Sequence, residues 1–397
     1  MTDSAASPRP SFRDKLNRSG PRKLLALDGG GIRGLITVEI LARMEKMLRE
    51  EHGNDQLVLA DYFDYVAGTS TGAIIATCIA LGMPMTEVGK FYEENGDAMF
   101  DKSSFLKRFR YKYEDDRLAG MLRTVLREKS GESSDPTLGS EGLRTLLMMV
   151  MRNATTDSPW PLSNNPNAKY NRRDREGSKG ASNLDLPLWQ LVRASTAAPT
   201  YFPPEEVQVD GNRFLFVDGG ITTYNNPSFL LFLMSTMGAY NLNWEPGADR
   251  MLLVSVGTGT SPDANANLAP SDMNLLYNAA SIPSALMFAA LNEQDLLCRV
   301  FGRCRHGAPL DREVGTLIDP PGSGPGPLPK LFTYMRYNAE LTREGLAEIG
   351  VPHIEPEHVQ QLDSVKFIKE LKEVGQAVAR QVDRAHFEGF LPGAAPS

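Results

Sequence analysis

The chain has 397 residues, of which 41% are hydrophobic and 23% are charged, and its formal net charge is −7 at pH 7. These fractions are typical of a globular protein with a sizeable core. The negative net charge gives no electrostatic basis for binding a nucleic-acid polymer, and no run of about 18 apolar residues predicts a membrane-spanning helix. The length fits one large domain with insertions as well as two domains.

The first 20 residues are polar and interrupted by prolines, and they lack the apolar segment that a signal peptide needs. We interpret them as a flexible lead-in. The three cysteines, Cys78, Cys298 and Cys304, form neither a C-x-x-C motif nor an evident disulfide framework, which favours a reducing compartment. We therefore expect a cytoplasmic protein.

A strand, a glycine loop and a helix are predicted in succession near the N-terminus. Lys23 to Leu27 (K-L-L-A-L) form a short apolar strand, and Asp28 to Gly34 (D-G-G-G-I-R-G) follow at once. Apolar residues then recur at helical spacing, with polar residues between them. Glycines at the start of a helix present unobstructed backbone N–H groups at the positive end of the helix dipole, and such donors can stabilise an oxyanion.

The same loop also satisfies the G-x-G-x-x-G pattern through Gly29, Gly31 and Gly34, so a dinucleotide site is an alternative. Such a site needs an acidic residue at the end of a second strand about 20 residues further on. Glu50 and Glu51 instead lie at the end of the predicted helix, before any second strand. The oxyanion interpretation is the favoured one.

A second glycine motif joins a predicted strand at 62–67 to a predicted buried helix at 73–81. The joint, Gly68 to Gly72, reads G-T-S-T-G. A G-x-S-x-G sequence between a strand and a helix is typical of a sharp turn that exposes a serine hydroxyl above the end of a sheet. Ser70 is therefore a candidate nucleophile, and an ordinary strand-to-helix turn is the alternative.

The middle of the chain is more varied. Residues 105–113 (F-L-K-R-F-R-Y-K-Y) alternate cations with aromatic rings, which fits either contact with an anionic lipid surface or a half-exposed strand. An amphipathic helix is predicted around 118–126. Residues 143–151 and 160–163 are predicted as antiparallel strands, and the polar residues 164–183 as a mobile loop.

A third motif region follows a predicted helix at 188–195. It reads A-S-T-A-A-P-T-Y-F-P-P from Ala194 to Pro204, and the strand at 213–217 then ends in Asp218-Gly219-Gly220. Open α/β sheets place their chemistry at such strand ends. Asp218 is therefore a second candidate, although an aspartate that caps a turn is the alternative.

The alternation of strands and helices continues to the end of the chain. In the long helix we expect an interruption at Pro283, and its Met287, Phe288 and Leu291, with Leu276, either cover a lipid-binding cleft or, as the favoured alternative, pack in the core. The predicted elements are a helix at 225–237, a strand at 251–256, the long helix at 272–300, a loop at 319–329, a strand at 331–337 and a helix at 365–385.

Ser70 needs a base, which is usually a histidine held by a carboxylate. The five histidines are His52, His306, His353, His358 and His386, so none lies between residues 53 and 305. We therefore favour a two-residue arrangement in which Asp218 accepts the proton of Ser70 directly. A Ser-His-Asp triad that uses His306 or a later histidine is the alternative.

These motifs, D-G-G-G-I-R-G, G-T-S-T-G, A-S-T-A-A-P-T-Y-F-P-P and D-G-G, together resemble the patatin-like phospholipase family in content and order. The resemblance extends over about Lys23 to Tyr337. It implies an α/β class fold, a three-layer α/β/α sandwich with a mostly parallel central sheet. It also implies a catalytic dyad of Ser70 and Asp218, an acyl-enzyme intermediate, and neither a metal nor an organic cofactor. The matching residues assign the oxyanion hole to Gly29, Gly30, Gly31 and Arg33.

The substrates of the family are acyl esters of membrane lipids. The resemblance therefore implies a lipid acyl hydrolase of the phospholipase A type, which acts on membrane phospholipids and contacts the membrane peripherally. Bacterial cytoplasmic members include effectors that degrade the cell's own membrane when a cyclic dinucleotide made during phage infection binds them. Activation of this kind, with a role in antiviral defence, is a further hypothesis for this chain, and a homo-oligomer is compatible with the sequence.

We expect three parts: a lead-in at 1–20, a catalytic domain at 21–340 with insertions at about 97–140 and 164–183, and a helical extension at 341–397. Two rival functions remain. One is a Ser-His-Asp carboxylesterase, which would also use a G-x-S-x-G turn. The other is a non-catalytic lipid-binding or storage protein that keeps the fold.

Overall fold

Strands of one mixed sheet form the centre of the computed structural model, which describes residues 11–100, 117–176, 180–199, 202–261, 275–318 and 328–393. The order across the sheet is β5-β6-β3-β2-β1-β7-β9-β8, and β4 pairs with β3 outside this path. The strands are β1 (Arg22–Leu27), β2 (Tyr65–Thr69), β3 (Leu146–Asn153), β4 (Ser158–Ser163), β5 (Glu205–Val209), β6 (Asn212–Asp218), β7 (Met251–Val256), β8 (Gly302–His306) and β9 (Phe332–Tyr337).

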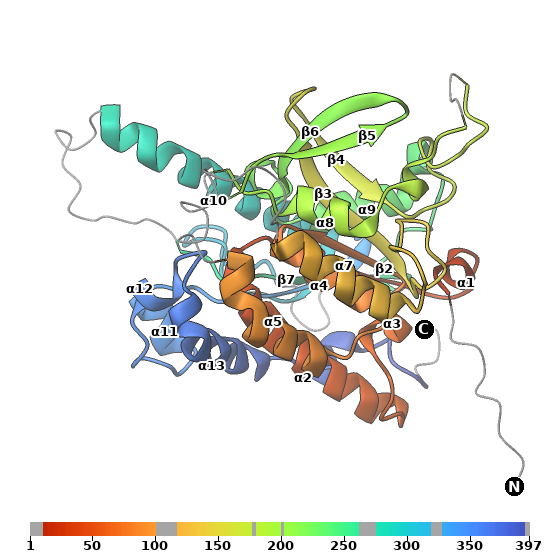
Figure 1. Cartoon of the computed structure of the whole chain (residues 1–397). Coiled ribbons are helices and arrows are strands. Elements are labelled where there is room, and N and C mark those ends of the chain that lie inside the picture. The colour runs from red at the N-terminus through yellow and green to blue at the C-terminus, as the bar shows by residue number, and fades with distance from the viewer. Residues whose placement is uncertain are drawn as a thin grey trace, which may run out of the picture.

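Helices cover both faces of the sheet. Figure 1 shows α2, α5 and α13 on one side and α9 and α10 on the other, which confirms the predicted α/β/α sandwich. The helices are α1 (Phe12–Leu16), α2 (Gly34–His52), α3 (Leu59–Tyr62), α4 (Thr71–Ala80), α5 (Met85–Phe100), α7 (Arg117–Ser130), α8 (Leu188–Ser195), α9 (Ser228–Thr236), α10 (Leu275–Phe301), α11 (Arg343–Glu348), α12 (Pro356–Val359) and α13 (Ile368–Ala379).

Six neighbouring strands, β3, β2, β1, β7, β9 and β8, are parallel. Parallel strands with helices on both faces have no solvated side, so their sequences are continuously apolar instead of alternating. The core of β1, Leu24 to Leu27, is fully buried for this reason, as are all residues of β7. The sheet is therefore mostly parallel, as the sequence predicts.

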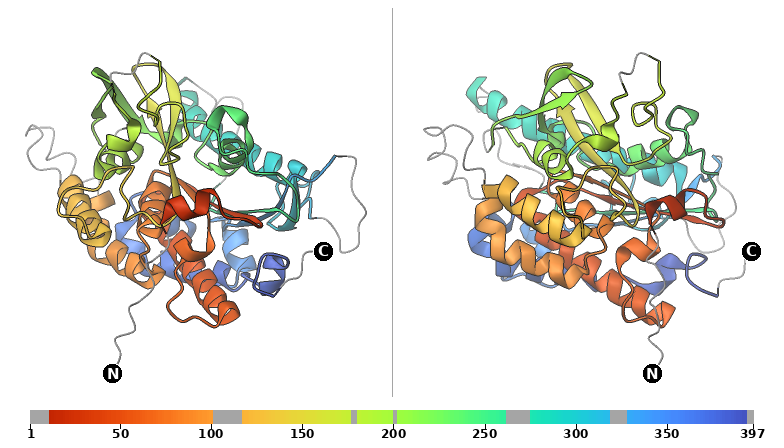
Figure 2. Two further views of the ribbon diagram at one scale, coloured as in Figure 1. Left: turned by 90° about the vertical axis from the view of Figure 1, so that its right-hand side faces the viewer. Right: turned by 45° about the vertical axis from the view of Figure 1, so that its right-hand side comes forward.

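An antiparallel arm of β4, β5 and β6 extends this sheet, and it rises on the side of α9 and α10 in Figure 2. Met148 of β3 pairs with both β2 and β4, so β2 and β4 lie on opposite edges of β3. Met151, three residues further on, pairs with β4 and with Asp218 of β6. Thus β6 occupies the edge that β2 leaves after Thr69 and runs toward it, so that the C-terminal ends of the two strands meet.

Most predicted elements are confirmed to within a few residues, including the antiparallel pair β3 and β4 and the helix at 188–195. The predicted break at Pro283 is wrong, because α10 is continuous from Leu275 to Phe301. A proline removes one helical hydrogen bond and does not by itself end a helix. The predicted terminal helix at 365–385 is shorter than expected, since α13 ends at Ala379.

The polar segment 164–183 is anchored where the structure describes it. Asn164, Asn165 and Asn171 are buried, and the amide of Asn171 donates to the carbonyl oxygens of Ser163 and Asn165. Buried polar side chains need such partners. The expected mobile loop is therefore fixed by its own asparagines over this part, whereas residues 105–113 and most of the predicted loop at 319–329 lie outside the described residues.

Within the described part of the chain, no helix combines the length and the apolar character that crossing a membrane requires.

The C-terminal helix α13 packs along α2. Gly375 lies at this contact, where a Cβ atom would come within 2.8 Å of the Glu39 Cβ and 3.0 Å of the Ile36 Cα. Glycine therefore permits the close approach of the two helices.

We predict that Gly375→Ala lowers the free energy of unfolding relative to Gly120→Ala. Both glycines lie in helices and gain similar helix propensity from alanine, but a Cβ at Gly120 meets no atom within 4 Å. The difference isolates the overpacking at Gly375, which we expect to cost about 1 to 3 kcal/mol. Urea unfolding of the two variants measures it, and equal stabilities would contradict the close contact between α13 and α2.

Candidate active site

Ser70 lies in a strained turn between β2 and α4. Its backbone has φ 55° and ψ −123°, an unfavourable region for a residue with a side chain, and such strain is typical of a nucleophile elbow. The flanking glycines permit the turn: a Cβ at Gly68 would lie 2.0 Å from the Gly72 carbonyl oxygen, and one at Gly72 would lie 2.3 Å from the Leu27 carbonyl oxygen. The first turn of α4 is thereby held against the end of β1.

Asp218 directly contacts this serine. Ser70 Oγ donates a hydrogen bond to Asp218 Oδ2 at 2.6 Å, and the Gly220 N–H donates to Asp218 Oδ1 at 2.6 Å. The carboxyl is buried, and burial raises its pKa to about 6, although both hydrogen bonds oppose the shift. No salt bridge to Asp218 is present among the described residues. Asp218 is therefore a better proton acceptor than an exposed aspartate.

Ser195 closes the gap in the sheet where β2 ends. The backbone N–H of Ser70 donates to Ser195 Oγ at 3.0 Å, and Ser195 Oγ donates to the Val150 carbonyl oxygen at 2.6 Å. One hydroxyl thus replaces a hydrogen bond between strands. Two residues later, the Ala197 carbonyl oxygen accepts from the Asp218 N–H at 2.9 Å. The last residue of α8 and the segment that follows it therefore hold both Ser70 and Asp218 in place.

The glycine loop after β1 borders the same site, but its three glycines are not equivalent. The Gly29 N–H donates to the Asn225 carbonyl oxygen at 3.1 Å, and the Gly29 carbonyl oxygen accepts from Thr258 Oγ1 at 2.8 Å. In contrast, the N–H groups of Gly30 and Gly31 have no hydrogen-bond partner among the residues that the structure describes. Gly31 has φ 58°, which favours glycine.

A buried ion pair lies beneath this loop. Arg336 Nη2 contacts Asp28 Oδ2 at 2.5 Å, and Arg336 Nη1 donates to Ser255 Oγ at 2.6 Å. On its other side Arg336 Nε lies 3.7 Å from Asp295 Oδ2, and Asp295 forms a further ion pair with Arg299 of the same helix. Because an isolated buried charge is unfavourable, this cluster ties the start of the glycine loop to β9 and α10.

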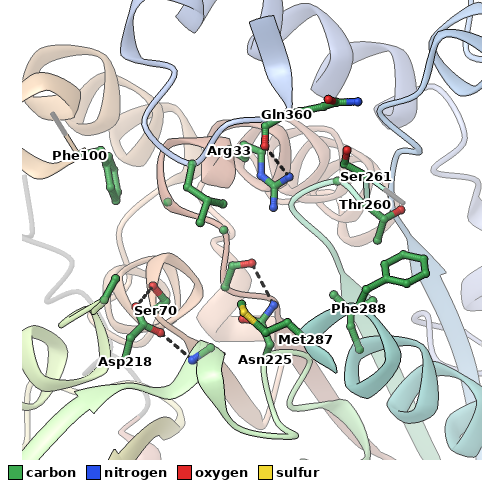
Figure 3. Close-up of a pocket in the computed structure, with 18 of the residues that line it drawn as sticks. Arg33, Ser70, Phe100, Asp218, Asn225, Thr260, Ser261, Met287, Phe288 and Gln360 are labelled. Atoms are coloured by element: carbon green, nitrogen blue, oxygen red, sulfur yellow. Dashed lines mark hydrogen bonds between the residues drawn. The ribbon is translucent and has the colours of Figure 1, made fainter. Parts of the chain in front are cut away.

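Ser70 and Asp218 line a cavity of about 880 Å³. Figure 3 shows them on one side of this cavity, with Phe100 above them and Met287 and Phe288 of α10 across from them. Met287 and Phe288 line the cavity and are only partly buried, so the preferred assignment of these two side chains to the core is wrong. Leu291 lines the cavity and is also buried, and the side chain of Leu276 lies outside the described residues. Other apolar lining residues are Ile74, Met99, Leu118, Phe202, Ile221 and Leu362.

Arg33 directs its guanidinium into the cavity (Figure 3). Its Nη1 donates to the Gln360 carbonyl oxygen at 3.1 Å, whereas its Nε has no hydrogen-bond partner among the described residues. Burial lowers the pKa of Arg33 to about 10, against the opposing effect of the Asp28 charge, so the side chain stays cationic at neutral pH. It is a positive charge that a bound anion can neutralise.

The segment before α13 supports the glycine loop from the outside. The Ile32 N–H donates to the Leu362 carbonyl oxygen at 3.0 Å, next to the bond from Arg33 to Gln360. The Gln360 side chain in turn donates to the Leu341 carbonyl oxygen at 2.8 Å. Residues far outside the sequence motifs thus fix the conformation of the loop.

None of the five histidines, all of which the structure describes, lines the cavity. His306 and His386 stack on each other with ring centroids 4.6 Å apart, and burial lowers the pKa of His306 to about 4. His353 contacts Glu373, and His358 stacks on Phe367. The described residues also contain no cluster of three or more side chains suited to a metal ion.

The structure brings the six candidate site residues together at one cavity: Gly29, Gly30, Gly31, Arg33, Ser70 and Asp218. The N–H of Gly29, which we expected to face an oxyanion, instead donates to the Asn225 carbonyl oxygen. Sequence reasoning missed Ser195, Asn225 and Arg336, which position the site without a recognisable spacing. The small residues from Ala194 onward were a signal of close packing, but not of the hydrogen bonds that Ser195 makes.

Comparison with known proteins assigns the family. The model described as "Patatin-like phospholipase" matches residues 25–231, slightly more than half of the 397-residue chain, and this range contains the glycine loop, Ser70 and Asp218. The chain belongs to the patatin-like phospholipase family.

Relatives and solved structures cover the chain to different extents. Patatin-17 of Solanum cardiophyllum is 30% identical in an alignment of 269 positions that covers 60% of this chain and 61% of that protein. Patatin-1-Kuras 2 of Solanum tuberosum is 30% identical in an alignment of 264 positions that covers 60% of this chain and 63% of that protein. The chain thus spans about three fifths of the length of these curated relatives. The structure of human GIVD cytosolic phospholipase A2 aligns with 96% of this chain and 62% of its own, with 12% identity and a TM-score of 0.44.

We predict that Asp218→Asn stabilises the protein at pH 8. The pKa of Asp218 is raised from 3.8 to about 6 in the folded protein, so its stabilising contribution is complete below 3.8 and is lost as the pH rises through 6. Two pKa units correspond to up to about 3 kcal/mol. Urea unfolding should show that Asp218→Asn has a higher free energy of unfolding than the native protein at pH 8, and that this difference is smaller at pH 5. A difference that does not depend on pH would contradict the raised pKa.

Proposed function

We propose that the chain is a lipid acyl hydrolase of the phospholipase A type, with Ser70 as nucleophile and Asp218 as general base. The observation that carries this proposal is the hydrogen bond of 2.6 Å between Ser70 Oγ and Asp218 Oδ2 at the wall of a largely apolar cavity. A serine in a strained elbow with one carboxylate as its partner is an arrangement for acyl transfer. Membership of the patatin-like phospholipase family supports the same class of reaction.

The contacts support the following reaction. Asp218 accepts the proton of Ser70 Oγ as this oxygen attacks the carbonyl carbon of the ester. The carbonyl oxygen becomes an oxyanion, for which Gly30 and Gly31 provide the unpartnered N–H groups and α4 the positive end of its dipole. The intermediate collapses, the ester C–O bond breaks, and Asp218 returns the proton to the leaving alcohol. Water then attacks acyl-Ser70 by the same route and releases the fatty acid.

The cavity suits an acyl chain, and its cationic residue favours phospholipid over neutral lipid. The apolar side chains that line the cavity match an acyl chain, which gains free energy on leaving water. Arg33 directs a cationic group into the same space, and no carboxylate among the described residues forms an ion pair with it. A phosphodiester next to the scissile ester provides the missing negative charge. Ser261 and Gln360 offer further polar contacts for a head group.

We expect Ser70→Ala and Asp218→Asn each to lower the rate of ester hydrolysis by about 10⁴-fold, because each removes a group that acts on the reacting atoms. The rate of the native enzyme should fall about tenfold per pH unit below pH 6, since protonated Asp218 cannot accept the serine proton. Steady-state hydrolysis of a fluorogenic phospholipid measures both effects.

The histidines provide the control for this prediction. Asparagine at His306, His353, His358 or His386, tested one at a time, should leave the rate within about twofold, because none of these side chains lines the cavity. A variant that unfolds at the native temperature but loses activity would favour the triad of a carboxylesterase.

A separate experiment tests the substrate class. Mass spectrometry of a membrane-lipid extract should show free fatty acids and lysophospholipids with the native enzyme and neither with Ser70→Ala. A lack of both products would favour a lipid-binding protein.

We further propose that the protein acts in the cytoplasm at a membrane surface, and that a cyclic dinucleotide activates it. A surface cavity of about 480 Å³ beside α13 supports the second point, because Lys369, Lys372 and Arg380 line it. Such cations suit the phosphates of a nucleotide. Glu39 and Glu93 already contact Lys372, so a ligand would compete with them. Because α13 packs on α2, and α2 begins at the glycine loop, a ligand that displaces α13 would also shift the glycine loop of the active site.

We predict that a cyclic dinucleotide raises the rate of fatty-acid release from phospholipid vesicles. Lys369→Glu should raise the nucleotide concentration needed for half-maximal activation about tenfold, as expected for loss of one charged contact. Titrating a panel of cyclic dinucleotides against the native protein and the variant measures both. Rates that are equal with and without nucleotide would reject the activation and leave the hydrolase proposal untouched.

A further inference from the structure

A short stretch of α10 exposes apolar side chains on the outside of the protein. Residues 285–290 read A-L-M-F-A-A, and every one of these six side chains is at least partly exposed. Leu286 is 65% exposed, the highest value among the large apolar side chains that the structure describes. A helix that is apolar on all sides is normally buried, so an exposed stretch of this kind indicates a surface that a partner or a membrane covers.

The two sides of this stretch have different surroundings. Met287, Phe288 and Leu291 line the cavity that contains Ser70. Leu286 and Ala289 lie one turn apart on the helix and are not part of the cavity wall, so their exposure is to the outside. A single helical turn therefore connects the outer surface with the interior of the cavity through apolar side chains alone.

The charge pattern along α10 changes next to this stretch. The sequence has no charged residue between Asp272 and Glu293. Beyond Glu293, Asp295 and Arg299 form the buried ion pair that joins the cluster around Arg336. The helix thus has an uncharged outer half and a charged inner half that is fixed in the core. Figure 1 shows the outer half projecting past the sheet and the other helices.

We propose that the exposed apolar stretch at 285–290 of α10, with Leu286 and Ala289 on its outer side, is a docking surface for an uncharged lipid bilayer, into which these two side chains insert. The inference rests on the proposed function, because the bilayer then also supplies the substrate. Insertion removes the exposed apolar side chains from water and places the apolar wall of the cavity next to the acyl chains. A lipid can thereby leave the bilayer along Met287 and Phe288 and reach Ser70 without crossing water.

A bilayer fits this surface better than a protein partner for two reasons. The occupant has to cover the outer side of the turn and still leave the inner side open to substrate, and a fluid bilayer does both. The stretch offers no charged group for a polar partner to pair with, whereas hydrocarbon needs none. The net charge of the chain, −7, adds no attraction to anionic lipids. Binding through this surface is therefore hydrophobic, and salt has little effect on it.

The test compares Leu286→Glu with Leu296→Glu, both in the Ser70→Ala background so that binding is measured without hydrolysis. Leu296 is an exposed residue of the same helix, about 15 Å further along it and outside the cavity wall. Sedimentation with sucrose-loaded phosphatidylcholine vesicles should show partitioning at least about tenfold weaker for Leu286→Glu and within about twofold of the parent for Leu296→Glu, since burying one leucine side chain accounts for about this difference.

A second measurement locates the contact. The three native cysteines are all buried, so Leu286→Cys introduces a thiol that can be labelled selectively with a polarity-sensitive dye. The emission should shift to shorter wavelength on addition of phosphatidylcholine vesicles, equally at 50 mM and 500 mM salt. Binding that requires anionic lipid and disappears at high salt would overturn the proposal, because a cationic surface elsewhere would then carry the contact.

The remaining outcomes separate this inference from the proposed function. Leu286→Glu with Ser70 intact should hydrolyse a short-chain soluble ester at the native rate and vesicle lipid more slowly. No hydrolysis of either substrate by the native protein would reject the proposed function. Normal vesicle binding by Leu286→Glu would reject only the docking surface. A native oligomer that Leu286→Glu converts to a monomer, with no vesicle binding by either, would show that a second copy covers this helix, and it would also overturn the proposal.

Discussion

Two strands that share one edge of β3 and run toward each other determine where the candidate active site forms. β2 ends at Thr69 and β6 ends at Asp218, so the first residue after one strand meets the last residue of the other. Ser195 bridges the gap between them with one hydroxyl. Because side chains alternate along a strand, a shift of β6 by one residue would turn Asp218 to the opposite face of the sheet. The register on β3 is thus a condition for the contact with Ser70.

A buried cluster of charges imposes the second constraint, since it joins the glycine loop to the helix across the cavity. Asp28 begins the loop, and the buried Arg336 of β9 neutralises it. Arg336 also lies near Asp295, which fixes the inner half of α10 through Arg299. Loss of Arg336 would leave Asp28 buried and unpaired, a change that typically costs about 3 to 5 kcal/mol. The positions of the candidate oxyanion donors and of the opposite cavity wall are therefore coupled.

Local patterns predicted the local structure well, because buried parallel strands are apolar runs bounded by glycine. They predicted less where partners are distant in sequence. The pairing of Ser70 with Asp218 followed from the missing histidines, but the antiparallel direction of β6 had no local signal. β8, which reads G-R-C-R-H, was missed because an edge strand can be polar. Which of the loop N–H groups remains unpartnered depends on Asn225, almost 200 residues away, and no spacing rule could show it.

The family match ends at residue 231, whereas residues that line the cavity occur as far along the chain as Leu362. The two parts of the chain therefore contribute different features to the site. Residues 25–231 contain the candidate nucleophile, base and oxyanion donors. The opposite wall of the cavity comes from α10 and from the segment around Gln360 and Leu362. That segment also holds the loop itself, since its carbonyl oxygens accept from Ile32 and Arg33. The C-terminal segment is thus part of the cavity, and any change that displaces it must also alter the loop on which an oxyanion would be held.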